Sequence, residues 1–168
     1  YWLWLTRSTD TTPLYDTWAG SATNTTVLLP ANDTFYWVIV AVDEAGNTTT
    51  ANSSFTLVVD TQPPTAATLV SPLGGTAVFS PVFLDWNAAA DTLSGLTGYR
   101  LQIDTAGTFA SLLVDATLAA PDTTLLLAPG TYFWRVITGD EAGNFTVSAS
   151  DSFLSLGPSE TSPPTPFA

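Results

Sequence analysis

The sequence predicts an all-β protein built from two tandem antiparallel sandwiches, the first of them incomplete. The pentapeptide Asp-Glu-Ala-Gly-Asn occurs twice, at residues 43–47 and 140–144. Each copy follows a run of aromatic and β-branched residues that is typical of a strand. Between these landmarks, turn residues separate short apolar runs and no helical period is present. The chain therefore reads as two copies of one β unit.

The alignment of the two copies determines the predicted organisation, because equivalent residues stay about 97 to 99 positions apart. A repeat of this length is close to that of a seven-stranded sandwich. The landmarks are Tyr1 with Tyr99, Asp16 with Asp115, Thr26 with Thr124, Trp37 with Trp134, and Phe55 with Phe153.

The second copy contains a full set of seven predicted strands. The first strand is split around the turn at residues 71–75, and the third alternates strictly, which turns Tyr99, Leu101 and Ile103 inward. The predicted strands span residues 68–70 with 76–79, 82–86, 99–104, 111–118, 123–127, 131–138 and 145–156. Seven short strands with turn signals between them favour an antiparallel sandwich.

Several motifs of the second copy resemble those of fibronectin type III-like, or bacterial Ig-like, tandem repeats in prokaryotic extracellular surface proteins. They are the opening at residues 63–65 and 69–72, Trp86, and residues 98–104, 130–136 and 140–144. The resemblance covers the whole second copy and the later five strands of the first. It implies the sandwich fold, whereas such modules serve as spacers, adhesin stalks and fibre subunits alike.

The domain organisation follows from this alignment. We expect an incomplete domain at residues 1–60 with strands three to seven, a Pro-rich linker at 61–65, and a complete domain at 66–157. Residues 158–168, rich in Pro, Ser and Thr, are predicted to lead into a following repeat or subunit. The first residue is not Met and no signal peptide is evident, so we expect a mature or excised segment of something longer.

The first copy begins at strand three and lacks the two opening strands of the opposing sheet. Without them, one face of its sheet is predicted to expose six apolar side chains, and a soluble monomer does not tolerate such a face uncovered. Two sources of cover remain open: upstream residues of a longer repeat array, or strands of a neighbouring subunit in strand complementation. This strand-complementation face comprises Tyr1, Leu3, Leu5, Phe35, Trp37 and Ile39.

The opposite face of the same sheet is predicted to be apolar as well, because period two sends alternate residues outward. Three interpretations remain open: scattered surface aromatics, a contact with another copy of the protein, or stacking of sugars on the tryptophans. This predicted interface comprises Trp2, Trp4, Tyr36, Val38 and Val40.

Five asparagines match the N-linked glycosylation pattern Asn-x-Ser/Thr. Glycosylation would place the protein outside the cell, while the alternative is a Thr-rich strand surface favoured by β propensity alone. These candidate sites are Asn24, Asn32, Asn47, Asn52 and Asn144.

The acidic residues of the turns allow two interpretations. Related bacterial Ig-like arrays bind calcium with junction carboxylates, but calcium needs six to eight oxygens and no dense Asp-x-Asp-x-Asp loop is present. Ordinary solvated turn carboxylates are therefore expected, and no metal or other cofactor is assigned. These residues are Asp43, Glu44, Asp60, Asp91, Asp140 and Glu141.

The amino-acid composition argues against several classes of function. The net charge is −12, with no Lys or His and only three Arg, so the chain is expected to bind neither nucleic acid nor anionic lipid. The absence of Cys and the lack of a bilayer-spanning apolar run argue against thiolate metal sites and membrane insertion. Without His, Cys or Lys, an enzyme is not expected.

We therefore expect an extracellular structural protein that forms part of a filament, stalk or surface layer by contacts between its own copies. The alternative is a carbohydrate-binding or spacer module of a secreted enzyme or adhesin, with glycans as possible partners.

Overall fold

The structure is a computed structural model that describes residues 1–30 and 32–159. The chain divides into two compact units, Tyr1–Gln62 and Pro63–Ala168. All elements are strands, as the sequence predicts, and none of the described residues belongs to a helix long and apolar enough to cross a membrane. Within the predicted linker at 158–168, Pro158 ends the last strand and residues 160–168 lie outside the described part.

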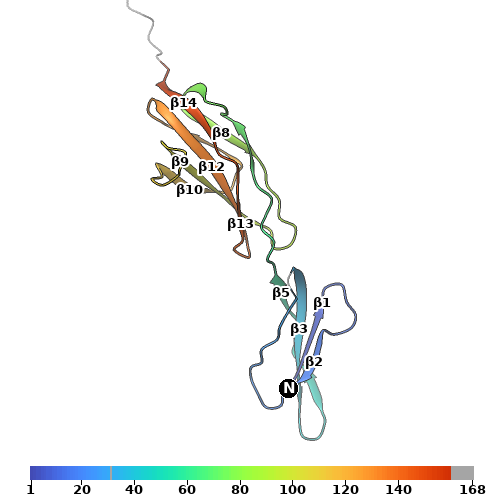
Figure 1. Cartoon of the computed structure of the whole chain (residues 1–168). Coiled ribbons are helices and arrows are strands. Elements are labelled where there is room, and N and C mark those ends of the chain that lie inside the picture. The colour runs from blue at the N-terminus through green and yellow to red at the C-terminus, as the bar shows by residue number, and fades with distance from the viewer. Residues whose placement is uncertain (31, 160–168) are drawn as a thin grey trace, which may run out of the picture. The chain divides into compact units, whose positions relative to one another are not determined.

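The second unit is a β-sandwich of two sheets, which Figure 1 shows as two facing layers. The larger sheet has the order β10-β9-β12-β14-β7 with β13 also on β12, and the smaller has the order β11-β8-β6. The strands are β6 (Thr68–Ser71), β7 (Thr76–Ser80), β8 (Val82–Asn87), β9 (Leu96–Asp104), β10 (Val114–Leu118), β11 (Asp122–Leu125), β12 (Gly130–Asp140), β13 (Phe145–Val147) and β14 (Asp151–Pro158). The predicted seven strands are present, with the last one broken at residues 148–150.

The core of the second unit forms where the two sheets face each other. Leu84 and Trp86 of β8 pack with Leu101 of β9 and with Trp134 and Val136 of β12, and each of these side chains is almost fully buried. The Trp86 ring lies 6.3 Å from the Trp134 ring, centroid to centroid. Alternating residues supply this core because period two turns one face of each strand inward.

The first unit is a single antiparallel sheet with the order β2-β1-β3-β4 and with β5 also paired to β3. Its strands are β1 (Trp2–Arg7), β2 (Tyr15–Trp18), β3 (Asp33–Val42), β4 (Thr48–Thr50) and β5 (Phe55–Val59). They correspond to β9, β10, β12, β13 and β14 of the second unit. No second sheet is formed by the described residues of this unit.

The strand that the alignment predicts around Thr26 is not formed, and this part of the prediction is wrong. Residues 24–29, Asn-Thr-Thr-Val-Leu-Leu, closely match residues 122–127, Asp-Thr-Thr-Leu-Leu-Leu, which contain β11. In the second unit β11 pairs with β8. The first unit has no counterpart of β8, and a strand is defined by the ladder that it makes with a partner.

The Asp-Glu-Ala-Gly-Asn turn closes the last hairpin of each unit, as predicted. Asp43 Oδ1 accepts the backbone amides of Ala45 and Asn47, and its Oδ2 accepts the Asn47 side-chain amide at 2.8 Å. Asp140 accepts from the Asn144 backbone and side-chain amides in the same way. The asparagine side chain lowers the pKa of Asp43 below its usual range, together with the backbone amides.

The glycine of this turn adopts a positive φ in both copies, +86° at Gly46 and +91° at Gly143. We expect Gly143→Ala to destabilise the second unit by about 1–2 kcal/mol, because a side chain there is strained although no atom lies within 4 Å of the added Cβ. Urea unfolding of the second unit measures this loss. The control is Gly107→Ala, which has ordinary backbone and places its Cβ 3.4 Å from the Phe133 ring. An equal loss in both variants would contradict the explanation.

We expect the buried Asp104 to make the stability of the second unit depend on pH in the acid range. Burial raises the pKa of Asp104, but the amides of Ser111 and Ala106 donate to its carboxylate and the net pKa is lowered. Unfolded aspartate titrates near about 3.9, so the folded unit binds fewer protons than the unfolded chain just below that pH. The contribution of Asp104 to the free energy of unfolding is therefore fully present above this pH. It is lost as the pH falls through the lowered pKa of the folded state. We expect Asp104→Asn to lose less stability than the parent between pH 6 and pH 3 in urea titrations, and an unchanged pH dependence would refute this assignment.

Candidate functional site

The sheet of the first unit presents two candidate surfaces, one on each face. The register pairs Trp2 with Trp18 and Val40, and Trp4 with Asp16 and Val38. Residues that are directly opposite on neighbouring antiparallel strands point to the same side of the sheet. We call the face that carries these residues the outer face, and the opposite one the inner face.

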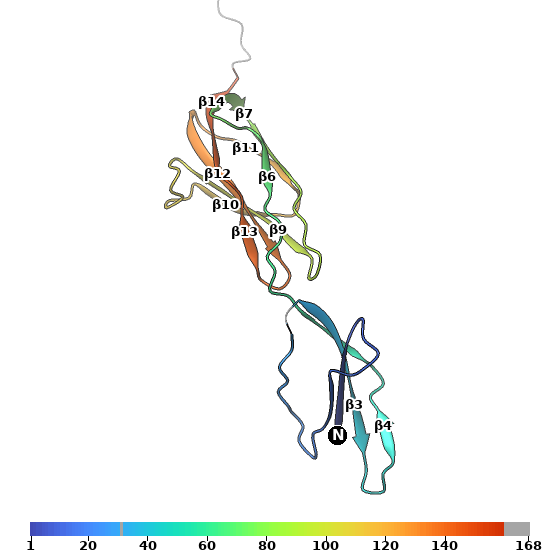
Figure 2. The same cartoon turned by 45° about the vertical axis from the view of Figure 1, so that its right-hand side comes forward.

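The inner face carries the six residues of the predicted strand-complementation face, and the structure covers only part of it. Leu5 and Phe35 are 3% and 0% exposed, so the expectation that all six face water is wrong for these two. Leu3 and Trp37 are partly buried, whereas Tyr1 and Ile39 are exposed. The cover comes from the chain itself: residues 19–30, in the connection between β2 and β3, run alongside the strands in Figure 2.

Between this connection and the sheet lies a groove of about 410 Å³. Leu3, Trp37 and Ile39 line it from the sheet, and Ala22 and Val27 line it from the connection. In the second unit the equivalent space is filled by β8, whose Leu84 and Trp86 belong to the core. The groove therefore corresponds to the space that β8 occupies in the second unit.

The connection is held in place without a strand partner. The Tyr15 hydroxyl donates to the Leu28 carbonyl at 2.6 Å. Within the described residues, the backbone of 24–30 forms no backbone hydrogen bond. Apart from the Leu28 carbonyl, the carbonyls of residues 24–29 and their amides remain available to a strand laid beside them, as those of β11 are used by β8.

The outer face is an aromatic surface. Trp2, Trp4 and Tyr36 are 38%, 47% and 40% exposed, and Val38 and Val40 are partly buried between them. Trp18, which sequence reasoning missed, is 50% exposed and its ring lies 5.6 Å from that of Trp2. The repeat alignment could have identified it, since Trp18 stands two residues after Asp16. Trp2 also borders the end of the inner groove.

The equivalent face of the second unit carries a mixture of polar and apolar side chains and differs from the aromatic face of the first unit. There Arg100 occupies the position of Trp2 and donates two hydrogen bonds to Asp115, the equivalent of Asp16. This ion pair lowers the pKa of Asp115 and raises that of Arg100. Arg135 donates to Gln102 and lies 4.2 Å from the centre of the Phe109 ring.

The candidate glycosylation sites differ in how the nitrogen that would carry the sugar is used. Nδ2 of Asn47 and of Asn144 donates to an aspartate within the turn. The Oδ1 atom of Asn32 accepts from the amide and hydroxyl of Thr61. Asn24 and Asn52 are exposed. The five sites are therefore not equivalent, and the two turn asparagines already have a structural role.

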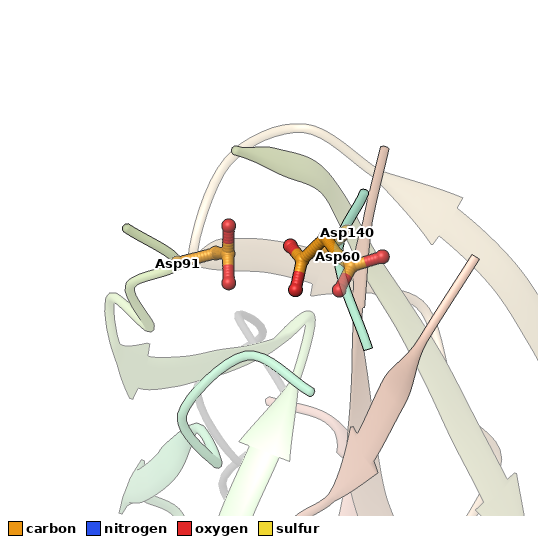
Figure 3. A group of neighbouring side chains, drawn as sticks. All are labelled: Asp60, Asp91 and Asp140. Atoms are coloured by element: carbon orange, nitrogen blue, oxygen red, sulfur yellow. The ribbon is translucent and has the colours of Figure 1, made fainter. Parts of the chain in front are cut away.

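The turn carboxylates are not all solvated, which corrects that expectation. Asp140 is 3% exposed and Asp60 is 8% exposed. Within the second unit, the carboxylate oxygens of Asp91 and Asp140 lie within 4.8 Å of each other, and Figure 3 shows both side chains. Asp91 Oδ1 accepts the amides of residues 93, 94 and 95, and Asp140 accepts from Asn144. Backbone amides thus account for the position of these carboxylates.

Comparison with known proteins gives a sequence relative and solved structures of similar fold, two of which are described below. No family model matches the chain. Chitinase A1 of Niallia circulans is 33% identical over 147 residues, which cover 82% of this chain and 20% of that protein. The chain thus spans a fifth of its relative's length.

The solved structures are fibronectin(III)-like modules of Clostridium thermocellum CbhA and the FN1–FN3 domains of chicken CNTN1. The CbhA modules are 15% identical with a TM-score of 0.45, and the match covers 94% of this chain and 77% of that one. The CNTN1 domains are 13% identical with a TM-score of 0.47, and the match covers 96% and 59%.

Proposed function

We propose that these two fibronectin type III-like units are a non-catalytic spacer in a longer extracellular protein that acts on polysaccharide. The 33% identity with part of a chitinase carries this proposal, because the aligned part covers most of this chain and only a fifth of the relative. The side chains of the chain support it: it has no His, Cys or Lys, and the carboxylates of Asp91 and Asp140 accept hydrogen bonds from backbone amides.

A spacer works by keeping two flanking domains apart, which a folded module does better than a flexible coil. The core of the second unit supplies that rigidity, and Pro63 and Pro64 restrict the backbone at the junction. The extracellular location follows from the same proposal, since structural polysaccharides such as chitin lie outside the cell.

The test places the chain between a chitin-hydrolysing catalytic domain and a chitin-binding domain. The control replaces it with a Gly/Ser linker of 168 residues. We expect faster hydrolysis of insoluble chitin with the folded spacer and equal hydrolysis of a soluble oligosaccharide. Equal rates on insoluble chitin would reject the spacer role.

A second candidate function is assembly of copies into a filament by strand complementation. The observation in its favour is the open inner groove together with the unpaired backbone of residues 24–30. Sedimentation of the chain over a hundredfold range of concentration tests it. Growth of large species with concentration is expected from assembly, and monomers throughout would reject it.

A further inference from the structure

We propose that the outer face of the first unit binds a neutral polysaccharide, with its sugar rings stacked on Trp2, Trp4 and Trp18 and its hydroxyls donating to Asp16. This inference deepens the proposed function and rests on it for the class of ligand. The face itself lies within one unit and is built from two adjacent strands, β1 and β2.

The first step concerns the tryptophans. Three indole rings on neighbouring positions are 38–50% exposed, and two of them are in contact. Isolated exposed apolar residues are ordinary, but a contiguous aromatic group at a sheet surface marks a binding site. The apolar C–H face of a pyranose ring fits against an indole ring, which is large, rigid and electron-rich on its face.

The second step concerns charge. Asp16 is exposed and lies directly across from Trp4. The only side-chain cation of residues 1–62, Arg7, lies 3.2 Å from Asp33. Among the described residues no hydrogen bond or ion pair engages the Asp16 carboxylate, whereas its equivalent Asp115 is paired with Arg100. The first unit thus presents an uncompensated carboxylate among aromatic rings.

The charge of Asp16 distinguishes between the ligands that this aromatic face could bind: a second copy of the protein, an anionic polymer or a neutral polysaccharide. Six carboxylates and one guanidinium give residues 1–62 a net charge of −5. A contact between two copies through this face would bury two Asp16 carboxylates without a cation, which costs several kcal/mol by desolvation. An anionic polymer would be repelled. A polyhydroxyl chain avoids both costs, because its hydroxyls donate to the carboxylate while its ring faces cover the indoles.

The test is a titration of the isotope-labelled 168-residue chain with chitohexaose and with cellohexaose, observed through the indole N–H signals. The six tryptophans provide internal controls. We expect the signals of Trp2, Trp4 and Trp18 to shift, and those of the core residues Trp86 and Trp134 to stay. A shift of Trp37 alone would place the sugar in the inner groove and overturn the proposal, as would no shift with either sugar.

The matched variant is Trp2→Arg with Trp4→Gln, which installs the residues that the second unit carries at these positions. The second unit shows that this sheet accepts them, with an arginine paired to the aspartate. We expect the variant to keep its unfolding midpoint and to bind the sugar at least about tenfold more weakly, since each lost ring contact is worth about 1 kcal/mol or more. Unchanged affinity would overturn the proposal.

A third arm separates sugars from cations, because indole faces and a carboxylate also attract guanidinium groups. Penta-arginine is titrated under the same conditions. Indole shifts with the peptide and none with the sugars would show a cation site and overturn the proposal. Failure of sugar binding leaves the spacer experiment unaffected, since that experiment compares linkers between domains that bind and cut chitin themselves.

Discussion

Replacing Trp134 with alanine is expected to destabilise the second unit by about 3–5 kcal/mol, the cost of truncating a fully buried aromatic side chain. The ring is 0% exposed, packs against Trp86, and donates its Nε1 hydrogen to the Pro72 carbonyl at 3.0 Å. Truncation therefore leaves a cavity between the sheets and an unpaired buried carbonyl. Urea unfolding followed by far-UV circular dichroism measures the loss.

The control for this variant is Phe145→Ala on β13 of the same unit, because Phe145 is 65% exposed and its loss is expected to stay within about 0.5 kcal/mol. If Trp134→Ala does not fold, Leu101→Ala tests the same core at a cost of about 2–5 kcal/mol. Equal effects at Trp134 and Phe145 would mean that the sandwich core does not hold this unit together.

Completing the first unit should have the second large effect. A copy of residues 67–98 joined directly before Tyr1 supplies the strands that correspond to β6, β7 and β8, since Tyr99 naturally follows Gly98. We expect the inner groove to fill and residues 24–29 to pair with the new strand as β11 pairs with β8. Burying two or three more large apolar side chains is worth on the order of 4 kcal/mol.

Three measurements follow this change: the unfolding midpoint of the first unit, the binding of a fluorescent dye that reports apolar surface, and hydrogen exchange of the amides at residues 24–29. The midpoint should rise, dye binding should fall, and the amides should become protected. The matched control carries Leu84→Ser and Trp86→Ser within the added copy, which removes the side chains that would enter the groove. Equal stabilisation by both additions would show that the groove is not the place of these strands.

The sequence alone determined the class of fold and the positions of most strands. The alternation of residues 99–104 and the repeated turn of residues 43–47 and 140–144 are local patterns, and local backbone preference and side-chain period decide them. The missing opening strands of the first unit could also be inferred from the sequence, because the second copy of the repeat served as a template for the first. The outer and inner sets of β1 and β3 residues followed from period two.

Other features depended on partners that lie far along the chain, and only the tertiary structure decided them. Whether residues 24–29 form a strand depends on a ladder partner, and their near-identity to residues 122–127 carries no information about one. Trp18 joins Trp2 through the register of β2 on β1, and Asp16 lacks a cation because Arg100 has no arginine counterpart in the first unit. Asp140 is buried while Asp43 of the same turn is exposed, since burial is set by what packs around a turn and not by its own sequence.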